Sequence, residues 1–252
     1  MSFVDSMRIL ALRRIEALSS SADAPSIVEA LERRRSEGFL ALIAEYKRVS
    51  PSGVIRLDLD PWTYFEKVSR YATALSVVAE PLRFAGHPLF VKVAVSFGRP
   101  VLYKDFVVSP RQLEEARGLG ASSALLIKRL LGDHLWELVD EARRLGLEPL
   151  IEVDNEDDAR EVAREAPDSL LGVNSRDLRD LSVSLERAKK AVEAVRGRVR
   201  LVVLESGIAS RRDAEAAASW GADAILVGTS LMRSPELAAE LSSVKVSSSP
   251  NA

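Results

Sequence analysis

The chain has 252 residues, of which 47% are hydrophobic and 29% charged, with 35 basic and 37 acidic residues and a net charge of −2. This balance excludes an intrinsically disordered or fibrous protein, and it offers no broad basic surface for a nucleic acid or an anionic membrane. Cysteine is absent and the two histidines lie far apart in the sequence, which excludes disulfides, thiolate chemistry and an obvious metal site.

The chain begins with a predicted helical segment from Phe3 to Gly38, with a turn at Ser19–Ser21. Its first twenty residues mix charged and apolar side chains, which indicates an amphipathic helix and not a secretion signal. No stretch approaches the roughly 18 uncharged apolar residues of a membrane span. We therefore expect a cytoplasmic protein. The last residues, Ser247–Ala252, are expected to form a frayed tail. The single glutamine and three asparagines suit a high-temperature source.

Eight short apolar runs follow, and segments with helical periodicity separate them. Such runs are typical of parallel strands that are buried on both faces. An unbroken alternation of this kind favours one (β/α)8 TIM barrel over residues 1–252, with residues 1–38 as a helical extension, although a doubly wound open sheet gives the same local pattern. The predicted strands are Leu40–Tyr46, Ala74–Val78, Pro100–Tyr103, Ser123–Ile127, Glu148–Ile151, Leu170–Val173, Arg200–Leu204 and Ala224–Val227. The predicted helices include Pro110–Leu119, Asp133–Leu145, Glu156–Ala166 and Leu185–Val195.

Polar residues stand at the carboxyl ends of several predicted strands, which is the end where TIM barrels carry their chemistry. Any one of them could simply mark the point where the chain leaves the core for water. The first, third and fifth strands together supply charged groups, however, and alternate strands contribute to the same interior layers of a barrel. The polar residues at strand ends are Glu45 and Lys47, Lys104, Glu152, Asn174 with Arg176, and Glu205 with Ser206.

Converging lysines and glutamates predict acid-base chemistry that needs no metal or cofactor. A neighbouring ammonium and partial burial would both lower the pKa of a lysine such as Lys104 toward the range of a general acid. A carboxyl group with a raised pKa could complement it.

Glycines and hydroxyl side chains after the last two strands predict a phosphate site, although each cluster alone could be an ordinary turn. Gly207 and Gly228 allow close approach of the backbone, and Ser206, Thr229 and Ser230 add donors. The loop after the first strand, Ser50–Gly53, is either a plain turn or a lid.

Six blocks of the chain, in order, resemble the indole-3-glycerol phosphate synthase family. The resemblance implies a lyase of tryptophan biosynthesis that closes the ring of 1-(2-carboxyphenylamino)-1-deoxyribulose 5-phosphate with loss of carbon dioxide and water. In that family a helical extension covers the substrate side of the barrel. The blocks are Ile43–Gly53, Leu102–Phe106, Pro149–Val153, Gly172–Leu178, Glu205–Ile208 and Val227–Met232.

The same resemblance implies roles for individual residues. Lys104 would be the general acid at the ribulose carbonyl, Lys47 would hold the substrate carboxylate and assist dehydration, and Glu152 would be the base or proton shuttle. Glu45 would orient a lysine, Asn174 would position substrate hydroxyls and Glu152, and Ser206 would complete the polar ring. Residues that would contact the substrate are Ser52, Phe84, Arg176, Leu178, Glu205, Gly207, Gly228 and Thr229.

Two departures from the family pattern and two other functions stay open at this point. The segment after the second strand lacks the usual threonine and serine near Phe84, and Lys128 replaces a small apolar residue; Lys128 is either a solvated strand end or an electrostatic neighbour of Lys104. Phe84, Phe106, Leu125 and Leu178 could form an aromatic pocket or belong to the core.

A lysine that forms a Schiff base would make the protein an aldolase-like barrel. A barrel that binds sugar phosphates without turnover is the third hypothesis. We expect a monomer whose only partner is its sugar-phosphate substrate.

Overall fold

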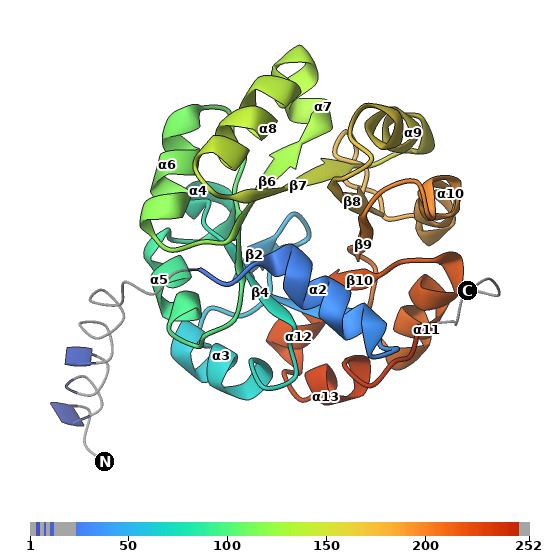
Figure 1. Ribbon diagram of the computed structural model, residues 1–252. Coiled ribbons are helices and arrows are strands. Elements are labelled where there is room, and N and C mark those ends of the chain that lie inside the picture. Colours follow the sequence, from blue (N-terminus) through green and yellow to red (C-terminus); the bar gives the residue numbers. More distant parts are fainter. Residues whose placement is uncertain (1–3, 6–7, 9–10, 13–23, 247–252) are drawn as a thin grey trace.

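Eight parallel strands close into a barrel in this computed structural model, which describes residues 4–5, 8, 11–12 and 24–246 (Figure 1). The hydrogen-bonded order around the barrel is β1-β10-β9-β8-β7-β6-β5-β4. The predicted TIM barrel is therefore confirmed, and the open sheet is excluded. Each strand lies within two residues of its predicted limits: β1 Ala41–Tyr46, β4 Ala74–Val78, β5 Val101–Lys104, β6 Ser123–Ile127, β7 Glu148–Val153, β8 Leu170–Asn174, β9 Leu201–Glu205 and β10 Ala224–Val227.

Helices surround the barrel, and local sequence sets their ends. Asn155 and Ser184, for example, accept hydrogen bonds from backbone N–H groups of the first turns of α9 and α10. Within the described ranges, no helix is long and apolar enough to cross a membrane. The helices are α2 Ile27–Ser36, α3 Pro61–Val68, α4 Pro81–Phe84, α5 Leu89–Val95, α6 Pro110–Gly118, α7 Lys128–Leu131, α8 Leu135–Arg144, α9 Glu156–Glu165, α10 Leu185–Val195, α11 Arg211–Trp220, α12 Thr229–Arg233 and α13 Leu237–Leu241, and Gly132–His134 forms a 3-10 turn before α8.

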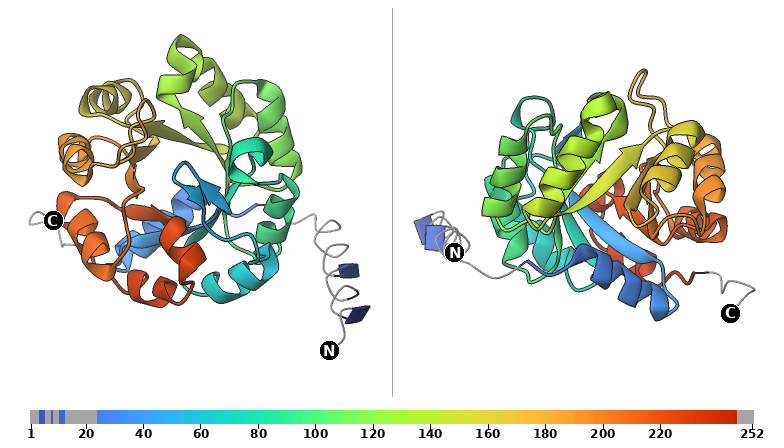
Figure 2. Two further views of the ribbon diagram at one scale, coloured as in Figure 1. Left: turned by 180° about the vertical axis from the view of Figure 1, so that it is seen from behind. Right: turned by 45° about the horizontal axis from the view of Figure 1, so that its top comes forward.

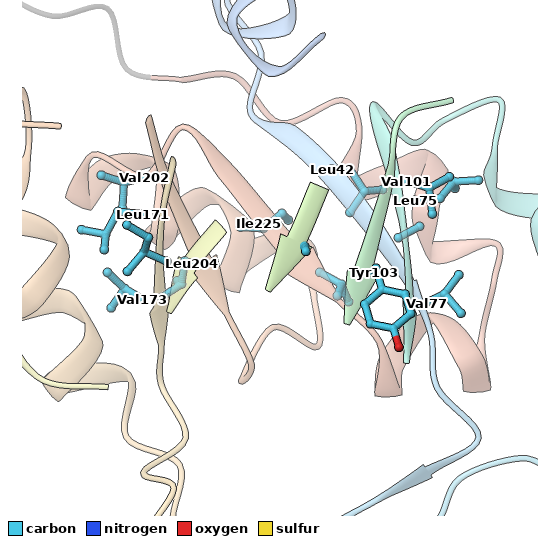
Figure 3. Packing of buried hydrophobic residues seen from close by; sticks show 14 of the residues in the cluster. Leu42, Leu75, Val77, Val101, Tyr103, Leu171, Val173, Val202, Leu204 and Ile225 are labelled. Carbon is cyan, nitrogen blue, oxygen red and sulfur yellow. The ribbon is translucent and has the colours of Figure 1, made fainter. Parts of the chain in front are cut away.

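The strands bury both of their faces, which explains why they are almost continuously apolar in sequence. Side chains that point outward, such as Leu42, Val77 and Leu204, pack against the helices (Figure 3). Side chains that point inward, such as Ile43 and Leu150, fill the barrel on the amino-terminal side of the strand ends. A parallel strand covered on both sides needs no polar face.

Helix α2 closes the amino-terminal end of the barrel (Figure 1). Ile27 and Leu31 are fully buried and join the inward-facing cluster. Glu148, at the start of β7, accepts a 2.6 Å hydrogen bond from the Ser26 hydroxyl and a 2.7 Å hydrogen bond from the Ile27 N–H. The expectation that the helical extension covers the substrate side is therefore wrong for α2. The apolar face of α2 packs against the amino-terminal end of the barrel instead.

Most of the predicted extension before Ala24 lies outside the described residues, as do the predicted turn at Ser19–Ser21 and the tail at Ser247–Ala252.

Replacing Leu31 with alanine should lower the free energy of unfolding by about 2–5 kcal/mol, because it leaves a cavity where α2 meets the barrel. Urea unfolding measures this loss. Turnover per folded molecule should stay unchanged, since α2 lies at the end opposite the strand carboxyl termini. Arg33→Ala, an exposed change on the same helix, is the control and should alter stability by no more than about 0.5 kcal/mol.

Candidate active site

A layer of four charged side chains fills the carboxyl end of the barrel. Glu45, Lys104, Glu152 and Glu205 come from β1, β5, β7 and β9, which are its first, third, fifth and seventh strands. The Lys104 Nζ lies 3.7 Å from Glu45 Oε1 and 3.6 Å from Glu152 Oε2, and it donates a hydrogen bond to Glu205 Oε2. Alternate strands of a TIM barrel supply one interior layer, so the sequence pattern and the geometry agree.

This layer rests on an apolar floor. Two residues earlier on the same strands, and therefore on the same inward face, lie Ile43, Leu102, Leu150 and Val203, all buried. The three carboxylates are at most 3% exposed, while the Lys104 side chain is 16% exposed. The ammonium is thus the most exposed member of the layer.

Lys47 lies next to this layer, and its Nζ is 2.5 Å from Glu45 Oε2. Two glycines make room for these charges. A Cβ at Gly228 would overlap the Glu45 carboxylate and would lie 3.2 Å from Lys47 Nζ, and a Cβ at Gly172 would overlap Glu205. Gly228, which the sequence assigned to phosphate, therefore also serves the Glu45–Lys47 ion pair.

The pKa of Lys104 is raised, and the sequence-based expectation of a lowered value is wrong. Burial lowers this pKa, but the carboxylates of Glu205, Glu152 and Glu45 together raise it further. The sequence predicted two lysines beside two glutamates, whereas the barrel places three glutamate side chains around one ammonium. Lys104 is consequently protonated at neutral pH.

Glu205 is the carboxyl group with the raised pKa that was expected to complement the lysine. Burial raises its pKa to about 8, with a further contribution from the charge of Glu152, and the ammonium of Lys104 opposes the shift. Its Oε1 atom is buried without a hydrogen-bond partner. Burial also raises the pKa of Glu45, but Lys47 and Lys104 bring it below its ordinary value. One carboxyl group of the layer can therefore hold a proton while a neighbouring one is ionised.

The pKa of Glu205 predicts a pH-dependent stability. The folded chain keeps a proton up to about pH 8 that the unfolded chain releases above about 4.5. This contribution is fully present below about pH 4.5 and is lost as the pH rises through about 8. Relative to Glu205→Gln, which cannot ionise, the wild-type free energy of unfolding should therefore fall across that range.

Urea unfolding of both proteins at several pH values measures this difference, and the exposed change Glu114→Gln is the control. A difference that stays constant with pH would mean that Glu205 does not change its protonation state in this window.

A cavity of about 370 Å³ lies on one side of the charged layer, over the last two strands. Ser206 and Gly207 have positive φ angles of 66° and 79°, which turn the chain sharply around the cavity. Arg233 also lines this cavity and was not predicted from the sequence. Its position one helical turn after Thr229 on α12 could have indicated it. The predicted phosphate contacts that line this cavity are Ser52, Ser206, Gly207, Gly228 and Thr229.

A smaller pocket of about 90 Å³ lies on the other side of the layer and has apolar walls. The rings of Phe84 and Phe106 are 5.9 Å apart between centroids. Leu125 and Leu178 also line the pocket, while Leu125 at the same time belongs to the buried inward cluster. The four residues predicted for an aromatic pocket thus come together, despite the altered segment after the second strand.

Asn174 and Arg176 lie at the end of β8 and line this smaller pocket. The Asn174 side chain is nearly buried, and its Oδ1 accepts a 2.9 Å hydrogen bond from the Arg176 N–H. Glu45, Lys47, Lys104, Arg176 and Ser206 line both cavities, so the two spaces meet at the charged layer. The arrangement suits an elongated molecule with an anionic end, an aromatic end and its reacting atoms between them.

The loop after β1 forms a short antiparallel hairpin of β2 (Val49–Ser50) and β3 (Gly53–Val54) near the carboxyl end of the barrel (Figure 2). Pro51 lines the smaller pocket and Ser52 lines the larger cavity. The hairpin therefore borders both spaces.

Lys128 lies outside the barrel. Its Nζ donates hydrogen bonds of 2.9 Å to Asp158 and 3.1 Å to Glu161, both on α9. These carboxylates hold it away from Lys104, so the interpretation of Lys128 as an electrostatic neighbour of Lys104 is wrong. Within the described part of the chain, no group of three or more histidine, cysteine, aspartate or glutamate side chains is arranged to hold a metal ion.

Comparisons with known proteins point to one family. A family model described as indole-3-glycerol phosphate synthase matches residues 5–244. A protein of that name from Pyrobaculum aerophilum is 46% identical over 211 residues, covering 83% of this chain and 84% of the relative. Another, from Pyrobaculum neutrophilum, is 48% identical over 208 residues, covering 82% of this chain and 83% of the relative.

Solved structures share the fold at low sequence identity. A tryptophan synthase chain from M. tuberculosis has a TM-score of 0.61 at 15% identity, covering 87% of this chain and 98% of that one. A thiamine phosphate pyrophosphorylase from Pyrococcus furiosus has a TM-score of 0.58 at 21% identity, covering 80% of this chain and 93% of that one. These two likenesses concern the barrel fold alone.

Proposed function

The chain belongs to the indole-3-glycerol phosphate synthase family, and from that premise we propose how its own residues carry out the family's reaction, with Lys104 as the general acid. The enzyme converts 1-(2-carboxyphenylamino)-1-deoxyribulose 5-phosphate to indole-3-glycerol phosphate, carbon dioxide and water. It is a carboxy-lyase of tryptophan biosynthesis.

The substrate spans the two cavities. Its phosphate lies in the larger cavity among the hydroxyl groups of Ser52 and Thr229, near the side chain of Arg233. Its carboxyphenyl ring lies between Phe84, Phe106 and Leu178. The ketone then lies at the charged layer, beside the partly exposed ammonium of Lys104.

Ring closure begins when the aromatic carbon that bears the carboxylate attacks the ketone carbon. The ketone oxygen gains negative charge and takes a proton from Lys104, becoming a hydroxyl. An alkoxide is more basic than an amine, so this transfer is favourable even though the pKa of Lys104 is raised. Carbon dioxide then leaves, and its bonding electrons restore the aromatic ring.

Dehydration requires a second proton at the new hydroxyl and the loss of one proton from the five-membered ring. Lys47 supplies the first, since its ammonium lies beside the layer in contact with Glu45. Glu152 accepts the second, because its carboxylate is 3.6 Å from Lys104 and lines the smaller pocket. Two protons enter and one leaves, which balances the loss of the carboxylate charge as carbon dioxide.

The remaining polar residues position these groups. Glu45 contacts both lysines and orients them, and Glu205 holds the ammonium of Lys104 through a hydrogen bond. Arg176 and Ser206 line both cavities and complete the polar ring, and Asn174 lines the smaller pocket, where it positions the substrate hydroxyls.

The observation that carries this proposal is the contact of one ammonium with three buried glutamate side chains. It favours a protonated lysine, which acts as an acid, over the free amine that a Schiff-base nucleophile requires. The purified protein should therefore release indole-3-glycerol phosphate from its substrate, detected by indole fluorescence, and borohydride should trap no adduct at Lys104. A covalent adduct would point to the aldolase-like mechanism, and binding without turnover would point to a sugar-phosphate-binding barrel.

We also propose that the enzyme works as a monomer in the cytoplasm. The proposed reaction needs only the residues that line the two cavities of one barrel, which supports the first part. Sedimentation equilibrium at working concentrations tests it.

A further inference from the structure

Asp154 lies just after β7, where its buried carboxylate accepts hydrogen bonds from α7, from the neighbouring Asn155 and from the loop after β8. Its side chain is 2% exposed. Oδ2 and Oδ1 accept bonds of 2.7 Å from Nε and Nη2 of Arg129, on α7. Oδ1 also accepts a 3.0 Å bond from the side chain of Asn155. Burial raises the pKa of Asp154, but the Arg129 guanidinium brings it below its ordinary value, so the group stays ionised.

The third contact reaches the loop between β8 and α10. Asp154 Oδ2 accepts a 3.3 Å hydrogen bond from the backbone N–H of Leu178, whose side chain lines the smaller pocket. The Arg187 side chain links the same two segments. Its Nε donates a 3.1 Å hydrogen bond to the Asp154 carbonyl, and its Nη2 donates a 3.0 Å hydrogen bond to the Ser175 carbonyl. The pair of Arg129 and Asp154 thus fixes the wall of a pocket that neither residue lines.

The loop that carries Leu178 is closed by its own backbone hydrogen bonds. Ser184 N–H bonds to the Ser175 carbonyl at 2.8 Å, and Asp177 N–H bonds to the Ser182 carbonyl at 2.9 Å. These contacts hold the loop's shape, and a 2.9 Å hydrogen bond from the Ser175 N–H to the Glu205 carbonyl ties its first residue to β9. At Leu178, the external contact is the hydrogen bond to the Asp154 carboxylate.

We propose that the Arg129–Asp154 ion pair is a positioning clamp that sets the Leu178 wall and thereby the affinity for the aromatic end of the substrate. This rests on the proposed function only in that the smaller pocket holds the carboxyphenyl ring. Lys104, Lys47 and Glu152 stand on or directly after β5, β1 and β7, so the clamp governs binding of the ring more than the proton transfers.

Asp154→Asn tests the clamp, because asparagine keeps the shape but loses the charge and turns an amide donor toward Arg129. We expect KM to rise about tenfold, the usual size of a lost charge-assisted hydrogen bond, while kcat changes by less than about twofold. Arg129→Lys retains the charge but not the two-pronged contact and should give a smaller rise. The Arg129→Lys variant provides the test if Asp154→Asn fails to fold.

Two probes distinguish binding at the aromatic end of the site from binding at the phosphate end. An N-arylamino sugar phosphate that cannot react should bind Asp154→Asn about tenfold more weakly than wild type, in proportion to the KM change. A pentulose 5-phosphate without the ring should bind both proteins equally. Lys128→Met is the matched control, since it breaks the neighbouring ion pairs to α9 without reaching the Leu178 loop.

Equal weakening of both probes, or a loss of kcat at unchanged KM, would overturn the clamp. Failure of the wild-type protein to form indole-3-glycerol phosphate would count against the proposed function instead, and the two failures are thus distinguished.

Discussion

Replacing Lys104 with methionine should lower kcat by about 10²–10⁴-fold, the usual contribution of a positioned general acid. Methionine keeps the apolar stem but removes the ammonium that lies among Glu45, Glu152 and Glu205. The three carboxyl groups would then face one another, and their pKa values would rise until some of them take up protons. The fold should survive this change, because neutral carboxyl groups can share the layer.

Steady-state assays that follow indole fluorescence measure the effect, and circular dichroism checks that the barrel is intact. Lys67→Met, on the exposed side of α3, is the matched control and should leave kcat unchanged. Turnover within about threefold of wild type in Lys104→Met would remove Lys104 from the acid role, because the smallest acid contribution is about 10²-fold.

Replacing Glu152 with glutamine should lower kcat by about 10²-fold or more, because the amide cannot accept the proton that leaves the ring during dehydration. The side chain is 3% exposed and lies beside Lys104, and glutamine keeps its volume and can still accept a hydrogen bond. Since the substrate contacts remain, KM should change much less than kcat.

Glu148→Gln is the matched control on the same strand. Glu148 stands four residues earlier on the inward face of β7, at the opposite end of the barrel, where it caps α2. This variant should lose stability in urea while its turnover stays normal. An intermediate that accumulates in Glu152→Gln after carbon dioxide release would place the residue at the dehydration step. Unchanged kcat in Glu152→Gln would exclude the base role altogether.

The order of the elements could be read from the sequence. Eight apolar runs predicted the eight barrel strands within two residues, because a strand buried on both faces leaves an unmistakable apolar pattern. Their polar ends predicted Glu45, Lys47, Lys104 and Glu152 as one group, because inward positions repeat every second residue. These properties depend on neighbours along the chain, so local sequence was sufficient.

Tertiary structure decided which groups meet and at which end. It closed the sheet, placed α2 at the amino-terminal end, turned Lys128 toward α9 and brought Arg233 to the larger cavity.

It also reversed the expected pKa of Lys104. The pKa of a buried group depends on every charge within a few ångströms, and here those charges include Glu205, which is 101 residues from Lys104 in the sequence. The sequence by itself determined which chemical groups the site contains, whereas their protonation followed from distances that only the closed barrel sets.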